Sequence, residues 1–151
     1  MAVTKAPSTE AMQAICDRIN EGGEYDLMVT ATYSEFLVDP LEEITSLRVD
    51  VVSESEEQLN ETLDVEDRTS HIIRIWMRKK VANVSNDEID YLKLLFRQIY
   101  QRVNDFNSAD GRVKVWELEI EPKEVPIKSI LQDNWLFVAS LVLRVEVEAS
   151  A

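Results

Sequence analysis

The sequence predicts an α+β domain, in which two helices pack on a mainly antiparallel sheet of about four to five strands. Apolar residues alternate with polar ones in several segments, as in half-buried strands, and recur at three-to-four spacing in two others, as in amphipathic helices. The order α-β-β-loop-β-α-β-β lacks the regular βαβ alternation of parallel-sheet proteins. A chain of 151 residues is expected to form one domain, spanning residues 1–151.

The first helix is predicted at residues 8–21, after a flexible N-terminus at residues 1–7. Ser8 or Thr9 is expected to cap it, and Gly22-Gly23 to end it. Its apolar residues, spaced as one helical face, are Met12, Ile15, Cys16 and Ile19.

Two strands are predicted next, at residues 25–34 and 45–52. In the second, Val49 and Val51 point inward and Asp50 points outward. Residues 53–67 then hold seven acidic side chains and no basic one. We expect a long acidic loop here, and loops of this length are usually functional or disordered.

The segment 70–81 has the clearest strand pattern in the chain. Ile73, Ile75 and Met77 form one face, and the opposite face carries basic and aromatic side chains. Ser85 and Glu88 have the spacing of a capping box, which predicts that a helix begins at residue 86 and runs to about 105. The apolar stripe of this helix consists of Ile89, Leu92, Phe96, Ile99, Val103 and Phe106.

The C-terminal part is predicted to form two more strands. Asp110-Gly111 makes a turn into a strand at 112–120, and Pro122 and Pro126 mark an irregular connection. The last strand covers about 134–148, and its first half is apolar on both faces.

Charge is divided unevenly along the chain. Residues 1–67 hold 17 acidic and three basic side chains, whereas residues 68–151 carry a net charge of only +1, so the total is −13. An acidic body of this kind repels nucleic acid and can offer its less acidic part to a protein partner.

Catalytic and metal-binding motifs are not found in the sequence. His71 is the only histidine and is expected to be an ordinary side chain near a strand end, and Cys16 lies on the apolar stripe of the first helix. The acidic segment lacks EF-hand spacing, and no P-loop, H-E-x-x-H or G-x-S-x-G is present. We therefore predict a protein that is not an enzyme, with no catalytic residue, no metal site and no cofactor.

An interaction surface is the preferred hypothesis. Trp and Arg are the residues most enriched at binding hot spots, and they gather on the outer face of the 70–81 strand. The alternatives are an ordinary solvated face with one Trp covered by a helix, and a nucleic-acid surface, which the net charge of −13 opposes. The predicted contact joins this face of one subunit to the acidic loop of another subunit or a partner; its residues are Arg74, Trp76, Arg78, Lys80, Glu54, Glu56, Glu57, Glu61 and Asp64.

The chain resembles the small tail-terminator (tail-completion) and neck proteins of tailed bacteriophages. The resemblance covers about residues 25–147 and lies in YDLMVTATYSEFLVDPLEEITSLRVDVVSES, DRTSHIIRIWMRKKV, NDEIDYLKLLFRQIYQRV and the final WLFVASLVLRVEV. It implies a non-enzymatic virion protein that forms rings, commonly hexameric, which cap the tail tube and join it to the head-side connector. Its expected partners are further copies of itself, the tail tube protein and the head-side neck or connector protein.

The resemblance also implies how the protein meets DNA and where it acts. DNA would pass through the ring without specific binding, helped by like charge. The protein would be made in the host cytoplasm and reside in the virion, and no apolar run approaches the ~20 residues that span a membrane. Three alternatives remain: the adjacent head-closure protein of the neck and, from other classes, an acidic DNA-mimic inhibitor or a small enzyme with an unrecognised site.

Overall fold

The chain folds into an α+β structure built on one five-stranded mixed sheet, as a computed structural model describes it for residues 6–21, 29–37, 44, 46–58, 67–82 and 86–149. The strands are β1 (Ala31–Ser34), β2 (Arg48–Gln58), β3 (Asp67–Lys80), β4 (Val113–Ile120) and β5 (Leu136–Ala149). Their order across the sheet is β1-β2-β3-β5-β4. The β1–β2 pair is parallel and the other pairs are antiparallel, which confirms the predicted fold class.

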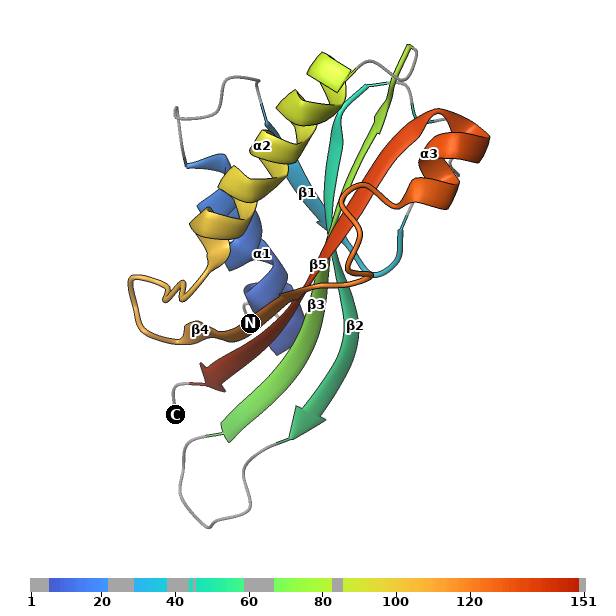
Figure 1. The fold of residues 1–151 in the computed structure, drawn as a ribbon. Helices are drawn as coiled ribbons and strands as arrows, with labels where there is room; N and C mark the ends of the chain where they lie inside the picture. Colours follow the sequence, from blue (N-terminus) through green and yellow to red (C-terminus); the bar gives the residue numbers. More distant parts are fainter. Residues whose placement is uncertain are drawn as a thin grey trace.

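Helices α1 (Pro7–Asn20) and α2 (Asn86–Val103) lie on one side of the sheet, as Figure 1 shows. The main core fills the space between them and the strands. Phe96 and Ile99 of α2 and Ile75 of β3 are among its fully or almost fully buried members. The predicted apolar stripes of both helices are therefore confirmed as core-facing surfaces.

The start of α1 differs from the prediction. The helix begins at Pro7, and Ala6 precedes it without a side-chain capping bond. Proline suits a first helical position because its ring presets φ and because no intrahelical partner exists there for an N–H. Ser8 and Thr9 consequently lie inside the helix, and the predicted end at Gly22-Gly23 and the capping residue Ser85 lie outside the described residues.

Strands β2 and β3 extend far into the segment that was predicted as an acidic loop at residues 53–67. Residues up to Gln58 belong to β2 and pair with β3, which starts at Asp67. The pairing slips between Ser53 and Ser55, where the ladder contains a bulge. The loop prediction is thus wrong for residues 53–58 and for Asp67, because cross-strand hydrogen bonds override the low strand propensity of glutamates; residues 59–66 lie outside the described part.

A third helix, α3 (Lys128–Asn134), occupies the connection that was predicted to be irregular. It lies on the opposite side of the sheet from α1 and α2 (Figure 1). Trp135 ends it in the left-handed conformation, with φ of 55°, and its N–H donates to the Leu131 carbonyl at 3.0 Å. The predicted turn at Asp110-Gly111 is present, with Gly111 at φ of 73°.

A second, smaller apolar cluster lies beneath α3. Its buried members are Ile44, Ile127, Leu136 and Val138, with Trp76 and Ile130 packed against them. This cluster explains why the first half of β5 is apolar on both faces: Phe137 points into the main core, and its neighbours Leu136 and Val138 point into the second cluster.

Candidate interaction surface

The predicted basic and aromatic residues do share the outer face of the sheet, the face away from α1 and α2. Ile73, Ile75 and Met77 of β3 enter the main core, so the alternating residues Arg74, Trp76 and Arg78 point to the other side. The structure therefore confirms the predicted alternation. It places these side chains in three different environments, however, and only Lys80 at the strand end is exposed.

Arg74 is held by contacts within its own subunit. Its Nε donates to Glu54 Oε1 at 2.5 Å, and its Nη1 donates to the Glu121 carbonyl at 2.8 Å and to Ser140 Oγ at 3.0 Å. The guanidinium carbon also lies 5.3 Å from the centre of the Trp76 ring, within cation–π range. The predicted contact between the acidic segment and the basic face thus exists here, but inside one chain.

Arg78 lies in a buried ion pair. Its side chain is 1% exposed, and its Nη2 donates to Asp50 Oδ2 at 2.9 Å. Asp50 is likewise buried; it also lies 3.3 Å from Thr32 Oγ1 and 3.7 Å from the Arg48 guanidinium. The expectation that Arg78 contacts a neighbouring subunit is wrong, because the second apolar cluster and its surroundings cover this end of the outer face. Asp50 points away from the main core as predicted, but it is buried there against Arg78.

Trp76 is partly buried and packs against the second cluster, as Ile130 of α3 also does. Part of the indole surface is therefore covered within its own subunit. Its register partners are Asp50 on β2 and Ser140 on β5, so it stands beside the buried ion pair.

Of the predicted acidic partners, Glu54 and Glu56 are exposed residues of β2 rather than loop residues. Glu54 binds Arg74, and Glu56 approaches His71, with 3.8 Å between Oε1 and Nε2. Glu57 belongs to β2 as well, and Glu61 and Asp64 lie outside the described residues.

A shallow groove of about 190 Å³ runs along the uncovered part of the outer face. A bulge in β4 between Val115 and Glu117 leaves both Trp116 and Glu117 exposed, and Arg144 of β5 binds Glu117 at 3.3 Å and lies over the Trp116 ring. Opposite charges alternate across this groove, which is lined by Glu54, Ile72, Arg74, Glu117, Glu119, Glu121, Val142 and Arg144. The bulge escaped the sequence prediction because alternation alone does not reveal where a ladder slips.

His71 is fully buried within β3, not at a strand end as predicted, because the strand starts four residues earlier at Asp67. Its Nε2 lies 2.7 Å from Thr69 Oγ1, and its Nδ1 has no hydrogen-bond partner among the described residues. Burial lowers the pKa of His71 from its ordinary value, and the nearby Glu56 carboxylate opposes that shift.

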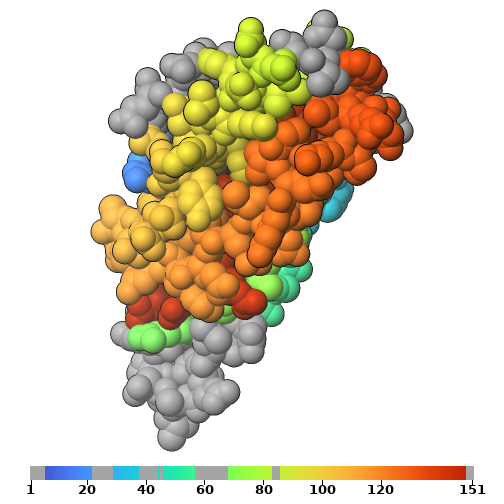
Figure 2. Space-filling view, in the orientation of Figure 1, coloured from blue at the N-terminus to red at the C-terminus, as the bar shows by residue number. Residues whose placement is uncertain are grey.

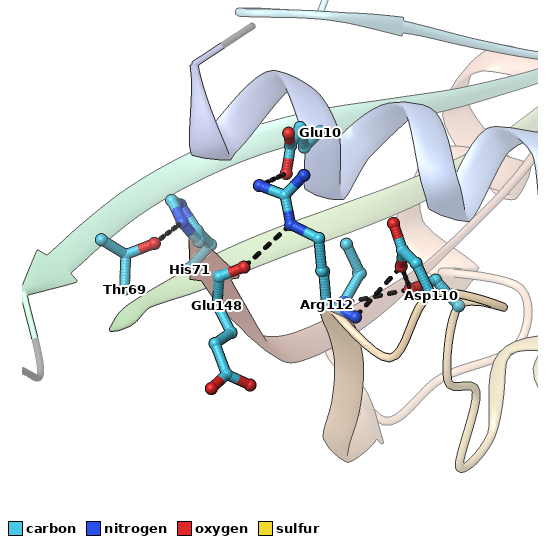
Figure 3. Close-up of polar contacts among 8 residues, drawn as sticks. Glu10, Thr69, His71, Asp110, Arg112 and Glu148 are labelled. Atoms are coloured by element: carbon cyan, nitrogen blue, oxygen red, sulfur yellow. Dashed lines mark hydrogen bonds and ion pairs between the residues drawn. The ribbon is translucent and has the colours of Figure 1, made fainter. Parts of the chain in front are cut away.

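Arg112 ties α1 to the edge of the sheet near His71 (Figure 3). Its guanidinium binds Glu10 of α1 at 3.1 Å and donates from Nε to the Glu148 carbonyl of β5 at 3.0 Å. Asp110 accepts hydrogen bonds from Ser108 Oγ and from the Arg112 N–H, and these bonds lower the pKa of its carboxyl group. These contacts are structural, since they join α1 and β5 to the turn that precedes β4.

Cys16 is buried in the main core, as predicted. Burial, with a smaller contribution from Asp17 and Asp50, raises the pKa of its thiol to about 12, so the reactive thiolate is scarce at neutral pH. Within the described ranges, no three side chains of His, Cys, Asp or Glu gather as ligands of a metal ion. None of the described helices has the length and apolar character required to cross a membrane.

Comparison with known protein families and with curated proteins found no match for this sequence.

Proposed function

We propose that this chain is a structural subunit of a tailed-phage virion, a ring-forming tail terminator that caps the tail tube and joins it to the head-side connector. The observation that carries the proposal is the order of the helices and strands along the chain. A mainly antiparallel sheet with α1 and α2 on one face follows the same order as the segments through which the sequence resembles that family.

The outer face of the sheet supports an assembly role over a DNA-mimic role. A mimic needs acidic groups spread continuously at roughly phosphate spacing. Along the groove of the outer face, Arg74 and Arg144 instead interrupt the glutamates and bind two of them, Glu54 and Glu117. The acidic charge along this groove is therefore partly neutralised and interrupted, not continuous.

The net charge of −13 suits a protein that surrounds DNA without binding it. Nucleic-acid affinity comes mostly from cations that neutralise phosphates, and a strongly acidic ring offers few of these. Repulsion between like charges keeps a passing duplex away from the wall of the channel.

Quantitative mass spectrometry of purified virions, with immunogold labelling, tests the proposal. We expect the chain in the particle at a few copies, with label where the tail meets the head. Its absence from particles would refute the proposal.

A deletion mutant then distinguishes the terminator from the adjacent head-closure protein. Loss of a terminator leaves tails of uncontrolled length, because nothing ends the polymerisation of the tube. Loss of a head-closure protein leaves tails of normal length that do not join heads.

A further inference from the structure

An apolar groove lies between α2 and the edge strand β4. Figure 2 shows α2 (yellow) and the segment 113–134 (orange) side by side. Its volume is about 430 Å³, and it is lined by Tyr100, Leu118, Glu119, Ile120, Lys123 and Val125. Lys123 is the single basic residue of this lining, and it has no ion-pair partner among the described residues.

The backbone edge beside this groove is open. Residues 106–108 cover the first part of β4, through bonds from the Ser108 N–H to the Val113 carbonyl and from the Val115 N–H to the Phe106 carbonyl. From Trp116 to Ile120, the described residues place no further strand on that side. Exposed strand edges are sites where other chains bind.

At the opposite edge of the sheet, β1 leads into a projecting aromatic side chain. Phe36 is 70% exposed, the most exposed of the large apolar side chains in the described residues. Ser34 Oγ donates to the Phe36 carbonyl at 2.6 Å, which fixes the backbone of this tip. Glu35 next to it is exposed and has no ionic partner in the described part of the chain.

We propose that copies of the chain join head to tail, with Phe36 of one copy seated in the apolar groove of the next and Glu35 of the first copy beside Lys123 of the second. The two surfaces complement each other in polarity and charge: one has an exposed aromatic group and an acid, the other an apolar groove and a base, and neither charge has an ionic partner among the described residues. They lie at opposite edges of one sheet, so the contact is heterologous and closes into a ring when the rotation between copies allows it. This inference rests on the proposed function and identifies the contact that builds the ring.

The aromatic group is expected to provide the affinity, and the charges the orientation. Glu119 also lines the groove, so the approaching Glu35 must lie on the Lys123 side. An exposed ion pair contributes little by itself, whereas buried aromatic anchors dominate many interfaces.

Cysteine cross-linking in the full-length chain tests the contact. Glu35→Cys and Lys123→Cys variants are mixed at about 0.15 M salt, where the Debye length of about 8 Å limits the general repulsion between acidic copies. A short bismaleimide then joins exposed thiols, and the buried Cys16 stays unmodified. We expect the mixed product to exceed the self-linked product of either variant several-fold.

The matched control replaces Lys123→Cys by Lys93→Cys, which is exposed on α2 and does not line the groove. Adding Phe36→Ser to the Glu35→Cys variant should lower the mixed yield at least about tenfold, while circular dichroism confirms that the exposed substitution leaves the fold intact. Equal yields for Lys123→Cys and Lys93→Cys, or no effect of Phe36→Ser, would overturn the contact.

The outcome also separates this contact from the proposed function. Virions that contain the chain while the cross-link fails would refute only the contact. A specific cross-link in a protein that is absent from virions would refute only the phage role.

Discussion

Replacing Arg78 by Met should destabilise the protein strongly, because it leaves the Asp50 carboxylate buried without its main partner. At the 2.9 Å separation of the two charged atoms, Coulomb attraction at an effective dielectric constant of about 20 amounts to about 6 kcal/mol, part of which offsets the desolvation of both groups. Removal of one partner from a buried pair typically costs ~3–5 kcal/mol. The Arg48 guanidinium at 3.7 Å and Thr32 Oγ1 at 3.3 Å still compensate the carboxylate in part, so we expect a loss at the lower end of that range.

Urea unfolding followed by tryptophan fluorescence measures this loss. The matched control is Arg144→Met, which breaks the Arg144–Glu117 pair, where both side chains are nearly half exposed; it should cost no more than ~1 kcal/mol. The double substitution Asp50→Leu/Arg78→Met should recover most of the stability, because buried pairs can be replaced by apolar residues at little cost.

Equal losses for Arg78→Met and the Arg144→Met control would refute the reasoning, since they would place Arg78 in solvent. A double variant that is less stable than Arg78→Met alone would contradict the electrostatic origin of the effect. In both cases the slope of the urea dependence must stay constant for the comparison to hold.

Four further expectations follow from burial. Phe96→Ala should cost ~3–5 kcal/mol in urea unfolding because the ring is almost fully buried, whereas Leu94→Ala, at an exposed position of the same helix, should cost below ~1 kcal/mol; similar losses would show that this face of α2 does not pack on the sheet. Trp76→Ala should lower the midpoint of thermal unfolding and leave cross-linking of the folded protein intact, since the indole packs within its own subunit; loss of cross-linking at unchanged stability would contradict this. The Cys16 thiol, with its pKa raised to about 12 by burial, should react with a thiol reagent only after unfolding, and fast labelling of the native protein would show that it is accessible. Because burial lowers the pKa of His71 from 6.5, the unfolded chain binds a proton more readily, so stability should fall as the pH drops below about 6.5; His71→Gln should weaken that dependence in urea titrations at several pH values, and an unchanged dependence would exclude His71 as its cause.

Local periodicity was enough to predict the elements that carry the main core. The apolar stripe of α2 and the alternation of β3 depend on the repeat of each element, 3.6 residues for a helix and two for a strand. An apolar face of either kind is stable only against another apolar surface, so the pattern alone predicts that Phe96 and Ile75 are buried and that the protein is α+β.

Longer-range features were decided by the tertiary structure. The segment 53–58 belongs to a strand because β3 pairs with it on both sides of the bulge at Glu54, and no local signal in this glutamate-rich segment indicates this. Helix α3 is short and presents no fully buried residue, so it leaves no periodic signature.

The candidate surface likewise combines a feature that local periodicity predicts with features that only tertiary packing decides. The sequence by itself determined that Arg74, Trp76 and Arg78 share one face of β3, because side chains alternate along a strand. Only the folded chain decided what covers that face: α3 and the second apolar cluster bury one end, where Arg78 pairs with Asp50, and Glu54 of β2 binds Arg74. The physical reason is that alternation depends on neighbouring residues, whereas burial depends on segments distant in the sequence that pack there.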